Sequence, residues 1–144
     1  MSEPTQLVTI VIADDDIADR LAIRRTLVQG GLCNPIIEVG DGQQLLDLVH
    51  GADADPDAPR PGLILLDLNM PTVDGREVLA RMADDETLSA IPVVVLTGSD
   101  EPDDIRRSYL AGVVSYVAKP VSFNEIRRVI SELDGYGLGI VKRG

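Results

Sequence analysis

The sequence contains a single cysteine, Cys33, among its 144 residues. One cysteine cannot form an internal disulfide, and it excludes a metal cluster held by several thiolates. Such sparse use of cysteine agrees with a reducing compartment, so we expect a cytoplasmic protein. Cys33 itself is expected to be a small buried hydrophobic residue near a loop.

Long apolar runs are also missing. No run approaches the roughly 18 apolar residues that a membrane span needs. The N-terminus, Met-Ser-Glu-Pro-Thr-Gln, lacks the basic region of a signal peptide. We therefore expect no membrane span and no membrane partner.

Positive charge is scarce compared with negative charge. The chain has 13 Lys and Arg against 24 Asp and Glu, which gives a formal net charge of −11. A chain with this charge repels phosphate backbones and anionic lipids, so we do not expect direct binding to nucleic acid. A protein partner should instead offer a basic or an apolar patch.

Aromatic residues are few, with three Tyr, one Phe and no Trp, although 44% of the chain is hydrophobic. The core is therefore expected to consist of Leu, Ile, Val and Ala. A chain of this length fits one domain and typically buries about two-thirds of its unfolded surface. We expect a single domain over residues 1–144, with a core at 7–134 and a C-terminal tail at 135–144.

Several short apolar runs end in polar or charged side chains. Residues 63–66 show no alternation, which is typical of a strand covered on both faces in a parallel sheet, and Asp67 follows them. The other runs are 7–13, followed by Asp14-Asp15-Asp16, 93–97, ending at Thr97, and 114–118, followed by Lys119. Because ligands bind beyond the carboxyl ends of parallel strands, these side chains are expected to converge at one edge of a sheet.

A helical pattern follows the first of these strands. Residues 16–29 show helical periodicity and end at Gly30-Gly31, and Asp16 is expected to cap the helix at its positive end. One broad apolar stripe of this helix carries Leu21, Ile23, Leu27 and Val28.

The remaining segments continue the alternation of strands and helices. A strand at 36–39 is followed by a helix through 45–49 and by a loop rich in Asp and Pro at 51–61. Three more helices are expected: one at 76–84, a fourth that runs to Ala111 and a fifth that runs to about 134. Ser122 and Glu125 form a capping box at the start of the fifth helix. Five βα repeats predict an α/β fold, a doubly wound five-stranded parallel sheet with five helices in the flavodoxin-like order 2-1-3-4-5. Strands one and three are neighbours in this order, so Asp14, Asp15 and Asp67 should meet.

Three carboxylates that meet at one edge repel each other, and a raised pKa or a bound cation relieves the repulsion. Oxygen ligands favour a hard cation, and Mg²⁺ needs few protein carboxylates, so Asp15, Asp67 and a carbonyl near Asn69 would suffice. The charges of three carboxylates, Mg²⁺ and Lys119 sum to zero. A carboxylate such as Asp67 can then attack phosphorus and form an aspartyl-phosphate, because the metal and the lysine screen the approaching phosphoryl group.

This arrangement closely resembles the receiver domain of bacterial response regulators over residues 7–134. The resemblance implies that Asp67 is the phosphoacceptor and that Asp15 binds Mg²⁺ directly while Asp14 binds it through water. It also implies that the backbone oxygen of Asn69 is the third protein ligand of the metal.

The same resemblance assigns roles to the ends of strands four and five. It implies that Thr97 and Lys119 contact the phosphoryl group, that Thr97 is also a switch residue, and that Tyr116 is the switch aromatic. Tyr116 could equally be an ordinary packed, half-buried tyrosine.

A second resemblance concerns a subfamily. The acidic, proline-containing segment before strand three, Asp-Gly-Arg-Glu-Val-Leu at 74–79 and Ile-Pro-Val-Val-Val-Leu-Thr at 91–97 are similar to the small stand-alone regulators paired with bacterial phytochrome kinases. This resemblance implies a sensor histidine kinase of the bacteriophytochrome type as the partner.

The tail at 135–144 is too short to be an effector domain, so we expect output by protein contact. We expect a homodimer through the face of helix four, strand five and helix five, to which the tail contributes. A fold-back of the tail onto its own domain is the alternative. The apolar residues of the tail are Leu138, Ile140 and Val141.

Two other functions compete with a signalling module. Haloacid-dehalogenase-type phosphatases also use an aspartate nucleophile and Mg²⁺, but they carry a second Asp two residues later, where this chain has Asn69, which cannot exchange a proton. A phosphate-free interaction domain would not need the intact acidic pair, Thr97 and Lys119. We therefore expect no enzyme activity beyond phosphorylation and dephosphorylation of the chain itself.

Overall fold

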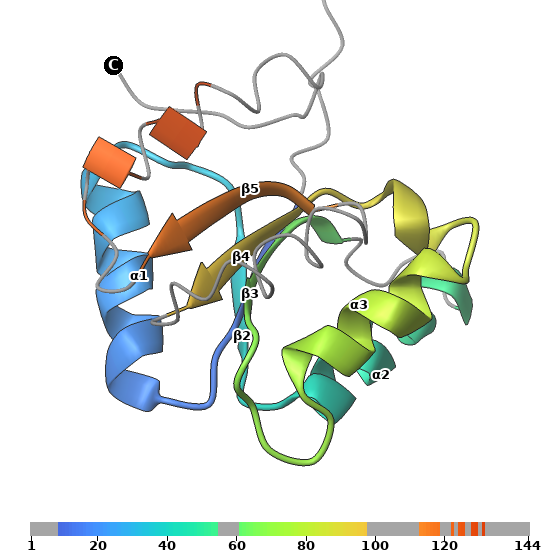
Figure 1. The fold of residues 1–144 in the computed structure, drawn as a ribbon. Coiled ribbons are helices and arrows are strands. Elements are labelled where there is room, and N and C mark those ends of the chain that lie inside the picture. Colours follow the sequence, from blue (N-terminus) through green and yellow to red (C-terminus); the bar gives the residue numbers. More distant parts are fainter. Residues whose placement is uncertain are drawn as a thin grey trace, which may run out of the picture.

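The computed structural model describes residues 9–54, 61–97 and 113–118, with residues 122, 124, 125, 128, 129 and 131. Its five strands form one parallel sheet in the order β2-β1-β3-β4-β5, which confirms the predicted fold (Figure 1). The strands are β1 at Thr9–Ala13, β2 at Ile36–Val39, β3 at Pro61–Asp67, β4 at Val93–Thr97 and β5 at Val113–Ala118.

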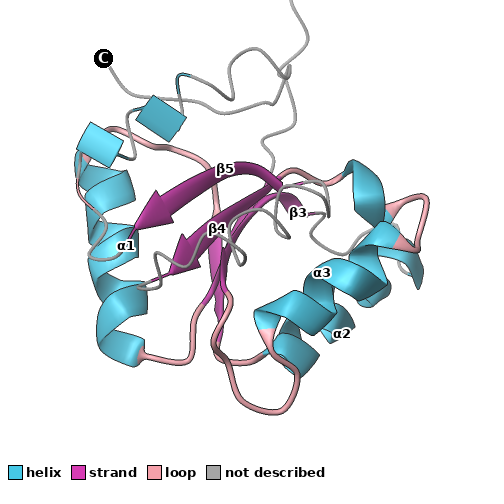
Figure 2. Ribbon diagram, viewed as in Figure 1, coloured by secondary structure: helices cyan, strands magenta, loops and turns pink. Residues whose placement is uncertain are grey.

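Helices lie on both faces of the sheet. Helix α1, Ile17–Gln29, covers one face, while α2, Gly42–Ala54, and α3, Gly75–Ala83, cover the other (Figures 1 and 2). A short 3-10 helix, η1 at Leu88–Ala90, precedes β4. Among the described residues, no helix is both long enough and apolar enough to cross a membrane.

Neighbouring residues of each central strand enter different cores. In β3, Leu65 packs in the cluster on the α1 side of the sheet with Ile23 and Leu27, and Leu66 packs in the cluster on the α2 and α3 side. Leu65 and Leu66 have 1% and 0% exposed surface. The unbroken apolar run therefore reflects burial on both faces, as the sequence predicts.

Local signals set the limits of α1. Asp16 is the N-cap, and its Oδ1 accepts hydrogen bonds from the backbone N–H groups of Ala18 (2.8 Å) and Asp19 (3.3 Å), which confirms its predicted role. At the other end Gly31 has φ 94°, and the N–H of Leu32 donates to the carbonyl of Leu27 at 3.1 Å. A glycine at this left-handed position is the usual end of a helix.

Three sequence predictions about burial are wrong. In the stripe predicted for α1, Ile23 and Leu27 are buried, but the side chains of Leu21 and Val28 are 49% and 46% exposed. The predicted stripe is wider than the side of a helix that one sheet can cover. Cys33, predicted to be buried, is exposed.

The predicted loop at 51–61 is too long. Helix α2 continues to Ala54 and β3 already begins at Pro61, whereas residues 55–60 lie outside the described part of the chain. The fourth helix and the C-terminal tail also lie outside it. The cap of the last helix is confirmed, because the N–H of Glu125 donates to Oγ of Ser122 at 3.2 Å.

Candidate functional site

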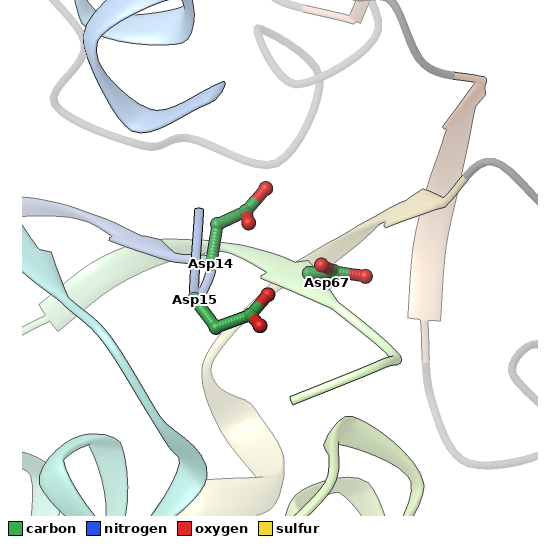
Figure 3. Close-up of side chains that lie close together, drawn as sticks. All are labelled: Asp14, Asp15 and Asp67. Carbon is green, nitrogen blue, oxygen red and sulfur yellow. The ribbon is translucent and has the colours of Figure 1, made fainter. Parts of the chain in front are cut away.

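Three carboxylates meet at the carboxyl edge of the sheet (Figure 3). Asp14 and Asp15 follow β1, and Asp67 ends β3, its neighbour in the sheet. One carboxylate oxygen from each of the three lies within 4.8 Å of the others. The structure therefore brings together the acidic residues that the sequence predicts to converge.

The three side chains differ in their contact with solvent. Asp14 is 0% exposed and Asp67 is 4% exposed, whereas Asp15 lies on the surface. The cluster is thus built on two buried carboxylates and opens to solvent at Asp15. A buried carboxylate is costly unless charge or hydrogen bonds compensate it.

Each buried carboxylate is oriented by the backbone that follows it. Oδ1 of Asp14 accepts a hydrogen bond from the N–H of Asp16 at 2.9 Å, and Oδ1 of Asp67 accepts one from the N–H of Asn69 at 3.0 Å. Both are turns in which an Asp side chain bonds the backbone two residues on. These bonds fix how the two carboxylates face each other.

The cluster fits a hard divalent cation. Its donor atoms are all oxygens, and the combined charge of three carboxylates at close range is costly without a cation. Mg²⁺ and Mn²⁺ both accept such a ligand set. Asp14, Asp15 and Asp67 can each present one oxygen, while the backbone oxygen of Asn69 as a further ligand stays a prediction.

The predicted residues at the ends of β4 and β5 are only partly described. Thr97 is the last residue of β4, and its neighbour Leu96 pairs with Asp67 across the sheet. Lys119 and the side chain of Thr97 lie outside the described residues. Tyr116 in β5 is half-buried and packs against the cluster on the α2 and α3 side, which suits both the switch and the packing interpretation.

The segment after Asp67 is packed more tightly than the sequence indicates. A Cβ atom on Gly75 would lie 2.4 Å from the backbone oxygen of Asp67, so α3 begins directly against the backbone of the candidate nucleophile. Thr72, in the same connection, has φ 66°, a strained conformation for a β-branched residue. The pair Asp74-Gly75 is typical of a turn, but a sequence pattern does not indicate this close approach.

Arg20 is a further residue of the site that the sequence motifs do not indicate. Its Nη1 donates a hydrogen bond to the backbone oxygen of Asp14 at 2.6 Å, and its Nε donates to Oε1 of Glu38 in β2 at 3.2 Å. The sequence offers one weak signal, an arginine one turn beyond the helix cap Asp16 and an acidic residue in the next strand. Only the pairing of β1 with β2 brings these groups together.

Known families and relatives match the chain along most of its length. The model of the response regulator receiver domain matches residues 10–131. The "probable methanogenesis regulatory protein FilR2" of Methanothrix harundinacea is 39% identical over 130 residues, which cover 90% of this chain and 83% of the relative. The response regulator Rcp1 of Synechocystis sp. is 33% identical over 132 residues, which cover 92% and 90%.

Solved structures agree with these relatives. The bacteriophytochrome response regulator AtBRR superposes with a TM-score of 0.78 at 36% identity, covering 90% of this chain and 94% of its own. The phosphorylated cyanobacterial phytochrome response regulator RcpA gives 0.75 at 34%, covering 91% and 94%. The Mn²⁺-bound form of Rcp1 gives 0.74 at 31%, covering 95% and 99%.

Proposed function

Because this chain belongs to the response regulator receiver domain family, we propose that it takes up a phosphoryl group on Asp67 from the phosphohistidine of a sensor histidine kinase, with Mg²⁺ at the acidic cluster. One observation carries the proposal. A carboxylate at the end of β3 lies within 4.8 Å of two others at the end of β1, with Asp15 open to solvent.

The proposed reaction is a transfer between two protein side chains. A carboxylate oxygen of Asp67 attacks phosphorus, the bond between phosphorus and the imidazole nitrogen breaks, and the products are an aspartyl-phosphate and a histidine. Asp15, Asp67 and the backbone oxygen of Asn69 would hold the cation, and Asp14 would bind it through water. When bound, Mg²⁺ supplies positive charge to the phosphoryl oxygens and offsets the charge of the carboxylates.

Residues at the ends of β4 and β5 would bind the new phosphoryl group. It adds a charge of about −1.5 to −2 and needs hydrogen-bond donors, which we assign to Thr97 and Lys119. When Thr97 and Lys119 bind the phosphoryl group, Tyr116, which is half-buried beside β4, would change its position as the switch aromatic. Arg128, whose Nη2 donates to the backbone oxygen of Tyr116 at 3.0 Å, would transmit the change to the last helix.

A labelling experiment tests the proposal. Wild-type protein mixed with a small phosphodonor such as acetyl phosphate should gain the mass of one phosphoryl group when Mg²⁺ is present. Removal of the metal by a chelator should abolish the gain, because the attacking carboxylate and the phosphoryl oxygens then repel each other. Equal labelling with and without the chelator would contradict the role of the metal, and no labelling in Mg²⁺ would contradict the function itself.

Relatives support a finer proposal for the partner. AtBRR and RcpA are described as response regulators of phytochromes, so we assign a phytochrome-type histidine kinase to this chain. A cytoplasmic location, output by protein contact through a homodimer, and no enzyme activity on other substrates remain predictions. We also expect no direct binding to nucleic acid, because the net charge of −11 repels phosphate backbones.

The surface beside the site supports docking of a kinase. Ile17, Leu21 and Val28 of α1 are 64%, 49% and 46% exposed, and their spacing places them on one side of the helix. We call these three exposed residues the α1 stripe, which differs from the stripe predicted from the sequence and starts three residues after Asp14. A protein that brings phosphorus to Asp67 must cover the border of the site, so an apolar surface there suits the donor kinase.

We expect Leu21→Gln to slow phosphotransfer from the kinase about 10-fold or more, because burial of a leucine contributes about 1.5 to 3 kcal/mol. Labelling by acetyl phosphate should not change, since α1 does not touch so small a donor. Ala22→Gln is the matched control, because Ala22 is exposed one position away from the stripe. If both donors slow equally, or if the two variants behave alike, the α1 stripe is not the docking surface.

A further inference from the structure

Arg20 connects α1 to the peptide between the two acidic residues of β1. Its Nη1 donates a hydrogen bond to the backbone oxygen of Asp14 at 2.6 Å, and its side chain is only 16% exposed. That oxygen belongs to the peptide plane that joins Asp14 to Asp15. Fixing its direction therefore restrains ψ of Asp14 and places the planar peptide and the Cα atom of Asp15, from which the Asp15 side chain extends.

In the described part of the chain, Asp15 has few other means of being held in place. Asp14 is fully buried, and its N–H donates to the backbone oxygen of Val39 at 3.1 Å, so β2 holds it from one side. Asp15 is exposed and lies after the end of the strand, where neither burial nor sheet pairing fixes it. The hydrogen bond from Arg20 is thus a direct restraint on the peptide from which Asp15 extends.

Arg20 shares the carboxylate of Glu38 with a second arginine, Arg24. Its Nε donates to Oε1 of Glu38 at 3.2 Å, and Nε of Arg24 donates to Oε2 of the same carboxylate at 2.6 Å. Arg24 also donates to the backbone oxygen of Ile36 at 3.2 Å. Glu38 and Ile36 both belong to β2, so this network ties α1 to the neighbouring strand.

We propose that Arg20 is a positioning residue that aims Asp15 at the divalent cation, an inference that rests on the proposed function of the acidic cluster. The guanidinium is suited to the task because its donors point in fixed, diverging directions. One donor meets Glu38 and another meets the Asp14 carbonyl. A lysine carries the same charge but cannot hold both groups in this geometry.

A positioning role and a purely electrostatic role of Arg20 predict opposite changes in metal affinity when the side chain is replaced. A positive side chain near three carboxylates opposes the binding of a cation, so loss of its charge alone would tighten metal binding. Loss of a positioning contact would weaken binding, because Asp15 would sample orientations that miss the cation. Groups that orient metal ligands typically contribute about 10- to 100-fold in affinity.

The test measures the affinity of the full chain for Mn²⁺ by electron paramagnetic resonance, with Mg²⁺ as competitor. Arg20→Met should bind Mn²⁺ about 10-fold more weakly than wild type, and Arg20→Lys should also bind more weakly although its charge is unchanged. Arg24→Met is the matched control. It removes the same charge from the same network but leaves the contact with Asp14, so it should keep the affinity of wild type.

The possible results separate this inference from the proposed function. Affinity equal to or above that of wild type in folded Arg20→Met, or in Arg20→Lys if the methionine variant does not fold, overturns the positioning role. Equal weakening in Arg24→Met overturns it too, because stability of the α1 and β2 contact would then explain the loss. A wild-type chain that binds no Mn²⁺ overturns the proposed function instead.

Discussion

Asp67→Asn is expected to take up no phosphoryl group from acetyl phosphate in Mg²⁺, under conditions in which the wild-type chain is labelled. An amide lacks the negative charge that makes the carboxylate a nucleophile, and it cannot form an acyl phosphate. Intact-mass spectrometry measures the result directly, since the product is one chain plus one phosphoryl group. We expect complete loss of labelling, because Asp67 is the carboxylate at the end of β3 that we propose as the phosphoacceptor.

Two further variants distinguish loss of the nucleophile from other effects of an Asp→Asn substitution. Asp47→Asn makes the same chemical change on the exposed side of α2, where Asp47 accepts a hydrogen bond from Gln43 at 2.9 Å and lies outside the acidic cluster, and it should be labelled like wild type. Asp15→Asn keeps the nucleophile and should be labelled more slowly, with recovery at high Mg²⁺. Labelling of Asp67→Asn equal to that of wild type would place the phosphoacceptor elsewhere.

Gly42→Ala should destabilise the fold by about 3 kcal/mol or more. A Cβ atom at Gly42 would lie 1.9 Å from the backbone oxygen of Val73 and 2.8 Å from its carbonyl carbon, so two backbone segments would have to separate. Urea unfolding measures the loss as a lower midpoint. Because Val73 lies in the connection that also carries Asn69, binding of Mn²⁺ should weaken in the same variant.

The same helix contains a control. Gly51 also lies in α2, and a Cβ atom there meets nothing within 4 Å. Gly51→Ala should therefore raise the free energy of unfolding by up to about 1 kcal/mol, since alanine is the better helix former. Opposite signs for the two substitutions are the expected result. Similar small changes in both would show that α2 and the connection after β3 are not packed as closely as this structure has them.

Much of the fold could be predicted because its signals are local or repeat along the chain. The unbroken run at 63–66 indicates a strand buried on both faces, and Asp16 and Gly31 limit α1 through bonds to residues a few positions away. Right-handed βα connections then leave few sheet orders, and the predicted 2-1-3-4-5 is the one observed. The meeting of Asp14, Asp15 and Asp67 follows from this order, because Asp14 and Asp15 come directly after β1 and Asp67 ends β3, its neighbour.

Apart from the length of the loop before β3, the predictions that failed concern which side chains are buried. Leu21 and Val28 belong to the same helix as Ile23 and Leu27 but lie around its other side, and they are exposed because the sheet covers only the side that carries Ile23 and Leu27. Cys33 is exposed although cysteine is among the most frequently buried residues. Composition and periodicity identify the apolar residues of a helix, but they do not show which of those residues the sheet will cover.

By itself the sequence determined the βα order, the helix caps and the set of carboxylates at the strand ends, since each depends on residue type and on spacing along the chain. Only the tertiary structure decided that Arg20 holds the Asp14 carbonyl, that Gly42 meets Val73 and that Gly75 lies against Asp67. These contacts join segments from different elements, and they depend on how helices pack against the sheet to within about an ångström. Close packing of that kind is a property of the assembled core and of no single stretch of sequence.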